Sequence, residues 1–582
     1  MSLSRREFLQ LLTAASAAGF ALPGCDSSNT TTAHTTASST NPADPYELKP
    51  FGNVSFMHFT DCHAQLLPVH FREPNINLGF GSAYGKAPHL VGDKFLKHFG
   101  IKPGTREAHA FTYLNYVEAA QKYGKVGGFA HLATLVKQIK AQRPNALLLD
   151  GGDTWQGSAT ALWTKGQDMI DACKLLGVDV MTGHWEFTYG AKRVQDIIKN
   201  DLDGHIEFLA QNVVETTFED RIFNPYTIKE QNGIKIAVIG QAFPYTPIAN
   251  PRYMIPDWSF GIRDEALQEL VDEVRGKGAQ VVVILSHNGM DVDLKMASRV
   301  TGVDAIMGGH THDGVPAPSV ISNSNGKTLV INSGSNGKFL SVLDLEVKGG
   351  KVSDYRFKML PIFSNLIKAD AQMTAHINKV RAPYKAKLEE KLAITDSLLY
   401  RRGNFNGTFD QLILNAQIEV QGADMAFSPG FRWGVSLLPG EAITREALMS
   451  QTAITYPKAT LNTITGENLK TIMEGIADNL FHEDPYYQMG GDMVRTAGLK
   501  YTIDPTAKMD HRISDMEING SKVEASKEYL VAGWAAVNPV PKGRPIWDIV
   551  EEYLKSIKVV KIDKPNVPKL KGSSGNPGIA SI

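Results

Sequence analysis

The sequence predicts a two-domain α/β protein preceded by an N-terminal leader. The chain has 582 residues, which is more than one hydrophobic core normally organises, so two folded domains are expected. Residues 46–365 alternate short apolar runs with helical stretches, a pattern typical of an α/β domain with buried strands. Residues 400–565 show a second, shorter α/β pattern. We therefore expect a larger N-terminal domain and a smaller C-terminal domain.

The composition excludes several classes of protein. Apolar residues make up 43% and charged residues 21% of the chain, and the net charge is −1. These values are ordinary for a globular protein, and without a basic surplus we expect no nucleic-acid partner. Three cysteines, Cys25, Cys62 and Cys173, are too few for a disulfide scaffold. Packing and metal ligation are therefore expected to hold the fold together.

The first 25 residues have the features of an export signal. Arg5 and Arg6 precede a short apolar stretch rich in Ala and Leu, which is the pattern of a twin-arginine signal. The stretch is shorter than the ~20 residues of a membrane span. The alternative is a cytoplasmic amphipathic N-terminus. The signal predicts a periplasmic protein exported in the folded state by the Tat pathway.

The end of this leader leaves two outcomes open. Leu22-Pro23-Gly24-Cys25 resembles a lipobox, in which the cysteine becomes a lipid anchor, although the proline is unusual there. Residues 26–45 consist almost entirely of Ser, Thr, Asn, Ala, Pro and Asp. Such a composition cannot bury a core and predicts a flexible tether. The leader therefore predicts either lipidation at Cys25 or simple cleavage.

Six apolar runs are the expected strands of the N-terminal domain. They are Val54–Phe59, Ala146–Leu149, Val178–Met181, Ile234–Ile239, Val281–Leu285 and Val303–Met307. Residues 66–128 interrupt the pattern with Gly, Pro and aromatic residues, and we interpret them as a partly helical insertion that forms a lid or docking segment. Residues 366–399 are expected to be a linker, helical over Ala371–Lys391. Residues 566–582 are expected to be a loose tail.

Five short motifs carry the chemistry. They are Asp61-Cys62-His63, Gly152-Asp153-Thr154, Gly183-His184-Trp185-Glu186, Ser286-His287-Asn288 and Gly309-His310-Thr311-His312. Each motif alone is weak evidence for a metal site, because a single histidine is more often a core or surface residue than a metal ligand. Their Asp and His side chains together offer two carboxylates and five imidazoles, which are ligands that borderline divalent metals prefer. This set suffices for two ions that share one bridging carboxylate.

The order of these motifs resembles the calcineurin-type metallophosphoesterases, and the added C-terminal domain resembles the 5′-nucleotidase family. The resemblance covers residues 52–560. It implies a four-layer αββα sandwich followed by a smaller C-terminal α/β domain of the 5′-nucleotidase type. A hydroxide between the two metals would be the nucleophile, because metal binding lowers the pKa of water to about 7. The resemblance implies one metal on Asp61, His63, Asp153 and His312, and another on Asp153, His184, His287 and His310, with Asp153 bridging.

The chain departs from the nucleotidase pattern at the third motif. The family's Gly-Asn-His-Glu-Phe-Asp is here Gly183-His184-Trp185-Glu186-Phe187-Thr188. The ligand Asn becomes His184, while the family's catalytic His and its partner Asp become Trp185 and Thr188. A degraded homologue is one interpretation, but every metal position keeps a ligand-type residue. The other interpretation is a substrate with a sulfur leaving group. Such a group needs no acid, because even a thiol ionises near a pKa of ~8.5.

Longer segments resemble the SoxB family of thiosulfohydrolases. They are Asp61–Leu66, Gly183–Gly190, Phe427–Gly434 and Gly490–Arg495. The resemblance implies a sulfonate substrate on a cysteine of the SoxYZ carrier protein, hydrolysed to sulfate with Trp185 in the catalytic position. It also implies manganese as the metal, although zinc or iron would suit the same ligands.

One arginine is a candidate for substrate binding. Arg432 occupies the position of the arginine in the nucleotidase Gly-Gly-Ile-Arg motif, and a guanidinium fork suits a sulfonate as well as a phosphate. The alternative is a structural salt bridge. Nucleotidases clamp the base between two aromatic side chains, and Tyr456, Tyr486 and Tyr487 are aromatic residues of this domain with no assigned role.

Three hypotheses follow for the function. We favour a thiosulfohydrolase. The alternatives are a 5′-nucleotidase or cyclic-nucleotide phosphodiesterase, and a carrier-docking protein whose metals are only structural. Activity on nucleotides and sulfate release from a loaded carrier separate the three.

Overall fold

The computed structural model describes residues 45–538 and 542–580. The leader and nearly all of the tether lie outside the described residues, so the twin-arginine signal, lipidation at Cys25 and the flexible tether stay predictions. Residues 48–582 form one compact unit. Among the described residues, no helix has both the length and the apolar character needed to cross a bilayer.

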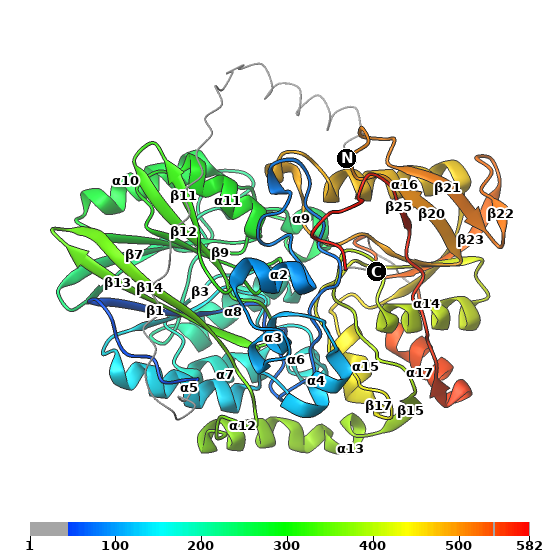
Figure 1. The fold of residues 1–582 in the computed structure, drawn as a ribbon, viewed down its shortest axis with the longest axis horizontal. Coiled ribbons are helices and arrows are strands. Elements are labelled where there is room, and N and C mark those ends of the chain that lie inside the picture. The colour runs from blue at the N-terminus through cyan, green and yellow to red at the C-terminus, as the bar shows by residue number, and fades with distance from the viewer. Residues whose placement is uncertain (1–44, 539–541, 581–582) are drawn as a thin grey trace. The chain divides into compact units, whose positions relative to one another are not determined.

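The N-terminal domain contains two six-stranded sheets (Figure 1). In the first, the strands in spatial order are β14 (Lys351–Pro361), β13 (Phe339–Lys348), β1 (Val54–Phe59), β2 (Leu147–Asp150), β3 (Val180–Met181) and β4 (Glu207–Phe208). β1 to β4 run parallel, while β13 pairs with β1 in the antiparallel sense. Every residue of β1 is buried, as expected for a strand covered on both faces.

The second sheet has parallel strands at its centre and a hairpin at each edge. Its strands in spatial order are β11 (Ser319–Asn323), β12 (Gly326–Asn332), β10 (Ala305–Gly308), β9 (Val281–Ser286), β7 (Ile234–Gln241) and β6 (Tyr226–Gln231). β12, β10, β9 and β7 are mutually parallel. All six predicted strands of this domain are therefore present, with ends shifted by at most two residues.

The two sheets pack face to face, and helices cover their outer faces. Val54 and Phe56 of the first sheet share one core with Val238 and Val283 of the second. α10 (Asp264–Gly276) and α11 (Met290–Arg299) cover the second sheet. α5 (Phe129–Gln142), α7 (Gln167–Leu176) and α12 (Ala371–Arg381) lie beneath the first sheet in Figure 1. This is the predicted four-layer αββα sandwich.

Shorter elements connect these layers. They are α6 (Ala159–Thr164), α8 (Ala191–Ile197), α9 (Thr246–Ala249), β5 (Val214–Glu215) and β8 (Trp258–Ser259). The insertion 66–128 holds three helices, α2 (Gly92–Phe99), α3 (Arg106–Phe111) and α4 (Tyr116–Tyr123). Phe95 and Phe111 of the insertion pack against Phe339 at the start of β13, so the insertion has its own small core on the N-terminal domain.

The predicted linker helix is shorter than expected. α12 ends at Arg381, and Pro383 lies in the turn that follows, before the short α13 (Lys385–Leu388). Proline has no N–H to continue the helix. The strand β15 (Lys391–Thr395) then begins inside the predicted linker and belongs to a sheet of the C-terminal domain.

The described part of the C-terminal domain contains three small sheets and four α-helices. The sheets are β17 (Ala442–Thr444), β15 and β24 (Val559–Val560); β18 (Ala459–Thr465), β23 (Glu528–Trp534), β16 (Met425–Ser428) and β19 (Arg495–Ala497); and β22 (Ser521–Lys522), β21 (Ile513–Ile518), β20 (Leu499–Ile503) and β25 (Lys569–Leu570). The helices are α14 (Thr408–Gln421), α15 (Arg445–Thr452), α16 (Gly466–Leu480) and α17 (Ile546–Ile557).

The expectation of a loose tail at 566–582 is wrong for its described residues. β25 adds to the sheet beside β20, and the buried side chain of Asn576 donates a hydrogen bond to the Gly79 carbonyl of the insertion. Ile579 also pairs with Ile76. The Pro- and Gly-rich composition therefore reflects a tight path that backbone hydrogen bonds hold against the insertion, rather than a lack of contacts.

Candidate metal centre

The five motifs meet because each follows the carboxyl end of a strand. Asp61 follows β1, Asp153 follows β2 and His184 follows β3, while His287 follows β9 and His310 follows β10. Carboxyl ends of neighbouring parallel strands open at the same edge of a sheet. The first two loops are joined directly, since the Asp61 and His63 amides donate to the Gly152 and Asp153 carbonyls, each at 2.8 Å.

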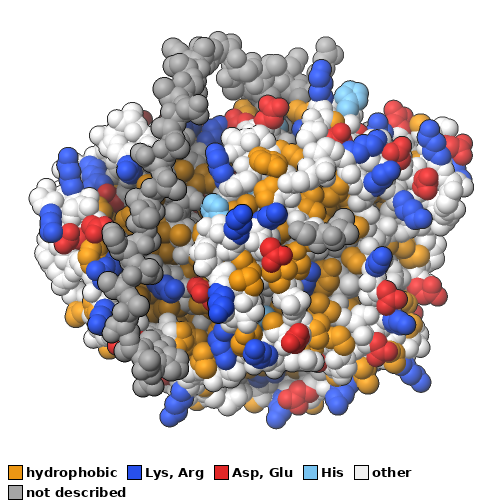
Figure 2. Space-filling view, in the orientation of Figure 1, with side chains coloured by type: hydrophobic (Ala, Val, Ile, Leu, Met, Phe, Trp, Pro, Cys, Tyr) orange, Lys and Arg blue, Asp and Glu red, His pale blue; other side chains and the backbone are white. Residues whose placement is uncertain are grey.

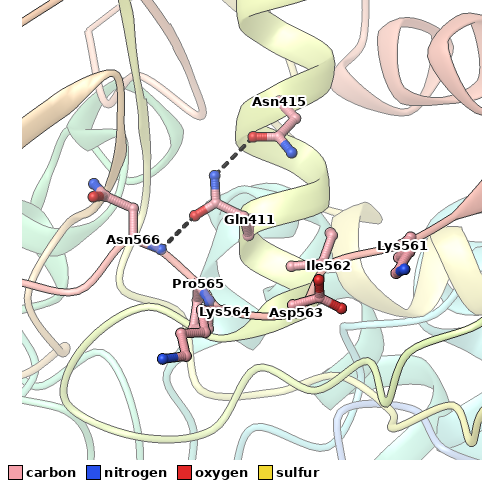
Figure 3. Close-up of a pocket in the computed structure, with 8 residues that line it drawn as sticks. All are labelled: Gln411, Asn415, Lys561, Ile562, Asp563, Lys564, Pro565 and Asn566. Atoms are coloured by element: carbon pink, nitrogen blue, oxygen red, sulfur yellow. Dashed lines mark hydrogen bonds between the residues drawn. The ribbon is translucent and has the colours of Figure 1, made fainter.

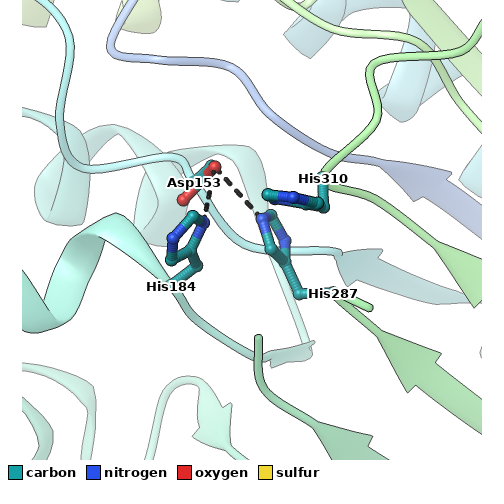
Figure 4. Close-up of side chains that lie close together, drawn as sticks. All are labelled: Asp153, His184, His287 and His310. Carbon is teal, nitrogen blue, oxygen red and sulfur yellow. Dashed lines mark hydrogen bonds and ion pairs between the residues drawn. The ribbon is translucent and has the colours of Figure 1, made fainter. Parts of the chain in front are cut away.

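All seven predicted ligand residues come together in two buried groups that share Asp153. One group contains Asp153, His184, His287 and His310 (Figure 4). The other contains Asp61, His63, Asp153 and His312. In each group the candidate ligand atoms lie within 4.8 Å of one another.

The shared carboxylate lies at the centre of these groups. Oδ2 of Asp153 is 3.3 Å from Nδ1 of His184, 3.1 Å from Nε2 of His287 and 3.7 Å from Nε2 of His63. Oδ1 of Asp61 is 3.2 Å from Nε2 of His312. The residues that the resemblance assigned to each metal are thus the residues that the fold gathers.

The donor set fits divalent metal ions. Neither ring nitrogen of the buried His310 has a hydrogen-bond partner, and such orphaned polar atoms are rare in a folded protein. Nε2 of His63 lies 3.1 Å from Nε2 of His312, so imidazoles from two loops meet at the centre. Imidazole and carboxylate donors suit manganese, iron and zinc. The fold and this donor set together imply a dinuclear centre.

The electrostatics of the centre also favour a cation. Burial lowers the pKa of His63 to about 3 and that of His310 well below its ordinary value, so both imidazoles offer neutral lone pairs. Burial also opposes a proton on His287, yet Asp153 and Asp61 raise its pKa to about 10. The two carboxylates therefore require nearby positive charge, and a metal ion can replace a proton in that role.

The backbone of the ligand loops is strained. Asp61, His63, Asp153, His310 and His312 all have positive φ, between 45° and 72°. For residues with a side chain this left-handed conformation costs about 1–2 kcal/mol each. Such conformations persist only where the surrounding structure enforces them, and they cluster at functional sites.

Glu186 holds two of these loops together. Its buried carboxylate accepts hydrogen bonds from the amides of Asp153, Thr154 and Trp155 in one loop and from the His184 amide in the other, at 2.7–3.2 Å. The motif around His184 contains this glutamate, but the sequence alone gave no reason to assign it a supporting role.

Hydrogen bonds fix the orientation of two imidazoles. Nδ1 of His287 lies 2.6 Å from the Gly151 carbonyl, which leaves Nε2 directed at Asp153. Nε2 of His184 lies 3.1 Å from Oδ1 of Asn250, which leaves Nδ1 directed at Asp153. Asn250 has no motif around it, so sequence analysis missed it.

Trp185 contacts the ligands through its backbone. Its amide donates to Oδ1 of Asp153 at 2.8 Å. Its ring packs edge-on against Trp433 and Phe431 and parallel to Tyr456, at centroid distances of 4.8, 5.1 and 5.8 Å. Trp433 in turn stacks on His63. The indole therefore belongs to an aromatic cluster that joins the two domains.

Two arginines of the C-terminal domain reach the His310–His312 loop. Nη1 of Arg432 donates to the His310 carbonyl at 3.2 Å, and Nε lies 3.4 Å from Asp492. Arg402, which sequence analysis missed, donates to the Thr311 carbonyl at 3.0 Å. Arg432 therefore lies beside the metal centre, and it also makes the salt bridge that was the alternative interpretation; its role in substrate binding stays a prediction.

Two of the three tyrosines without an assigned role lie in different places, and the third, Tyr487, packs against His482. Tyr456 lies in the aromatic cluster, whereas the Tyr486 ring is covered by the Lys295 ammonium at 4.1 Å. Lys295 also pairs with Asp484 at 2.5 Å. This contact joins α11 to the C-terminal domain, so Tyr486 belongs to the interface between the domains.

On the face drawn in Figure 2, basic and acidic side chains are interspersed, so neither charge dominates that surface. A pocket of about 500 Å³ lies beside Gln411, Asn415, Lys561 and Asn566 (Figure 3). Gln411 accepts from the Asn566 amide and donates to Asn415 there, both at 2.7 Å. These bonds hold the chain after β24 against α14, and no ligand residue lines the pocket.

Comparison with known proteins agrees with this architecture. Residues 54–314 match the family described as calcineurin-like phosphoesterase, and residues 391–537 match the 5′-nucleotidase C-terminal domain. The structure of the sulfate thiohydrolase SoxB of Thermus thermophilus superposes with a TM-score of 0.86 at 35% identity, covering 90% of this chain and 98% of that chain. The chain belongs to the SoxB family.

Other relatives place the SoxB family among the nucleotidases by fold. Rat 5′-nucleotidase is 30% identical over 279 residues, which are 44% of this chain and 47% of the relative. The match therefore spans about half the length of that relative. A 5′-nucleotidase precursor, also from Thermus thermophilus, shares the fold over 89% of this chain and 99% of its own, with a TM-score of 0.70 at 21% identity. The chain is a metallophosphoesterase-type hydrolase.

Proposed function

We propose that this chain is a periplasmic thiosulfohydrolase. It hydrolyses the terminal sulfonate from a cysteine-bound S-thiosulfonate on the SoxYZ carrier and releases sulfate. The observation that carries this proposal is the similarity to the SoxB sulfate thiohydrolase, which extends over both domains and 90% of the chain.

The proposed reaction breaks one sulfur–sulfur bond. The oxygen of water adds to the sulfonate sulfur, and the bonding electron pair leaves with the sulfane sulfur, which stays on the carrier cysteine as a persulfide. Asp61, His63, Asp153, His184, His287, His310 and His312 would hold two divalent ions, which we propose to be Mn²⁺. When bound, the ions supply Lewis acidity and an activated water.

The loss of the nucleotidase His–Asp pair suits this leaving group. Trp185 stands in the aromatic cluster, and the Thr188 hydroxyl donates to the Trp185 carbonyl at 2.7 Å. Neither side chain can protonate a leaving alkoxide. A persulfide needs no such acid, because even an ordinary thiol has a pKa of only ~8.5.

Arg432 is the proposed partner of the sulfonate. Its bonds to the His310 carbonyl and to Asp492 fix the guanidinium beside the ligand loop while using only Nε and Nη1. A guanidinium carries five N–H donors, so the fork retains donors for an anion. Asp492 is itself held by Arg495 at 2.9 Å, which keeps this arrangement rigid.

The aromatic cluster argues against a nucleotide substrate. Phe431 and Trp433 stack on each other at 4.2 Å, and Phe431 meets Trp534 edge-on. Trp185 of the catalytic domain closes the same cluster. The faces and edges of these rings already pack against one another. A purine base would have to disrupt this packing in order to stack on them.

The test is sulfate release from thiosulfate-loaded carrier, with and without added Mn²⁺. We expect metal-dependent release, far slower turnover of free thiosulfate at equal concentration, and little activity on AMP. Free thiosulfate lacks the remote contacts whose binding energy drives catalysis. Efficient hydrolysis of AMP without sulfate release would replace the proposal with a nucleotidase, and metal binding without either activity would indicate structural metals.

A further inference from the structure

One buried amide connects a candidate metal ligand to the opposite domain. Asn250 follows the short helix α9 of the catalytic domain, and this residue is only 3% exposed. Its Oδ1 lies 3.1 Å from Nε2 of His184, and its Nδ2 donates to the hydroxyl of Tyr456 at 3.1 Å. Tyr456 belongs to the C-terminal domain, so the amide bridges the two domains.

The bridge determines which nitrogen of His184 can bind a metal. An amide oxygen can only accept a hydrogen bond, so Nε2 of His184 must carry the proton. The lone pair then lies on Nδ1, and this atom is 3.3 Å from the shared carboxylate of Asp153. The opposite tautomer would place a lone pair against the amide oxygen and a proton against the metal site.

Tyr456 holds the other end of the amide. Its ring is buried and lies parallel to Trp185, with an interplanar angle of 4°. Its hydroxyl accepts from Nδ2. An amide rotated by 180° would still pair with this hydroxyl, which would then donate to Oδ1, but it would turn Nδ2 toward the Nε2 proton of a His184 that ligates through Nδ1. The C-terminal domain therefore holds Asn250 in place, and in this orientation the amide oxygen pairs only with a His184 that is protonated on Nε2.

We propose that Asn250 is a positioning residue that selects the Nδ1-ligating tautomer of His184, and that Tyr456 completes the second metal site from the opposite domain. This inference rests on the metal centre of the proposed function but not on its substrate. It also explains how a histidine serves where the nucleotidase pattern has asparagine: a histidine ligand needs a partner for its second nitrogen.

The test measures metal rather than activity alone. Mn²⁺ titration of the full chain, with metal analysis after dialysis, is compared for the wild type, Asn250→Ala, Asn250→Asp and Tyr456→Phe. Removing such a supporting partner typically weakens metal affinity about 10–100-fold, so Asn250→Ala should lose that much for one of its two ions. Asn250→Asp should largely recover it, because a carboxylate also accepts from Nε2. Tyr456→Phe should show a severalfold loss.

Asn212→Ala is the matched control. Asn212 is likewise buried and hydrogen-bonded, to the Ala242 and Gly261 carbonyls, but it contacts no ligand side chain. The Asn212→Ala variant should lose stability without losing either metal ion. If Asn250→Ala folds and binds two ions as tightly as the wild type, or if Asn250→Asp is as weak as Asn250→Ala, the positioning role is overturned. If Asn250→Ala does not fold, Asn250→Asp and Tyr456→Phe decide. Normal metal binding without sulfate release would contradict the proposed function alone.

Discussion

The backbone of Gly490 in the C-terminal domain touches the imidazole of His310 in the catalytic domain. A Cβ added to Gly490 would lie 2.2 Å from Nε2 of His310, and φ of Gly490 is +75°. No side chain fits there, so this glycine lets a loop of one domain close directly over a candidate ligand of the other.

Gly490→Ala should therefore damage the metal centre. The variant must displace either the loop or the His310 ring, and we expect metal affinity and kcat/KM to fall at least tenfold. Gly491→Ala is the matched control, because Gly491 has a similar φ of +80° but nothing within 4 Å of the added Cβ. Both variants carry a left-handed alanine at about 1–2 kcal/mol. If the two lose metal equally, backbone strain rather than the contact with His310 is responsible.

Asp153→Asn should remove most metal and activity together. Asp153 is the one residue common to both ligand groups, and a neutral amide supplies neither the charge nor the second oxygen needed to bridge two cations. Metal analysis and sulfate release measured on the same preparation check this. Full occupancy by two ions in Asp153→Asn would exclude the bridging role.

Arg432→Ala should lower kcat/KM about 10–100-fold while both metals stay bound. A charge-assisted hydrogen bond contributes ~1.5–3 kcal/mol, which corresponds to that range. Arg432→Lys should recover only part of the lost kcat/KM, because the point charge of an ammonium cannot replace the guanidinium fork. Arg544→Ala, which removes an exposed ion pair with Glu552, is the control and should leave the kinetics unchanged. Wild-type kinetics in Arg432→Ala would mean that this arginine is only a structural salt bridge.

Phosphomonoester hydrolysis should be poor. Trp185 and Thr188 leave no acid for an alkoxide leaving group, so we expect the rate on AMP to lie more than tenfold below that of a true nucleotidase. Initial rates on AMP and on loaded carrier, at the same metal concentration, check this. An AMP rate within tenfold of a nucleotidase would show that another group supplies the proton.

The pair of His89 and Asp291 predicts a pH dependence of stability. Burial opposes charge on both groups, but the close contact of 2.9 Å outweighs it, so the pKa of His89 is raised and that of Asp291 is lowered. Asp313 also favours a charged His89, and Arg432 favours a charged Asp291. The contribution of His89 is complete below its unfolded pKa of ~6.5 and is lost as pH rises through the higher folded value. The contribution of Asp291 to stability is complete above its unfolded pKa of ~3.9 and is lost as pH falls through its lower folded pKa.

His89→Gln should therefore lower Tm most between these limits, at about pH 5–6. At pH values above the folded pKa of His89, the difference between variant and wild type should shrink. Tm measured against pH for both proteins checks this. A difference that stays constant across the range would mean that His89 contributes by packing alone.

Sequence reasoning located the ligands because local and global signals coincide there. Asp61, Asp153 and His287 each follow an apolar run that proved to be a buried strand, so motif and strand together determine their place. None of Asn250, Arg402 and Gly490 directly follows such a strand, and the resemblance of Gly490–Arg495 to the SoxB family assigned no role to Gly490. Each acts on a ligand loop that is at least 60 positions away in the chain, and only the packing of the two domains brings them there.

Composition misled the prediction at the C-terminus for a related reason. Asn576 and Ile579 lie in a stretch that resembles a disordered tail, yet they bond to Gly79 and Ile76 of the insertion. A segment stabilised by backbone hydrogen bonds to a distant partner needs no apolar pattern of its own. The early start of β15 escaped notice similarly, because its partners β17 and β24 follow it by about 50 and 165 residues.

The left-handed backbone at five candidate ligands bears on how the centre chooses its ion. Loops that the fold already forces into costly conformations have little freedom to adjust their spacing to an incoming ion. Such a cage discriminates by ionic radius and preferred geometry, because a poorly sized ion cannot be accommodated by rearrangement. Replacing one of these residues' neighbours to relax the strain should therefore broaden the range of metals accepted before it weakens binding of the native one.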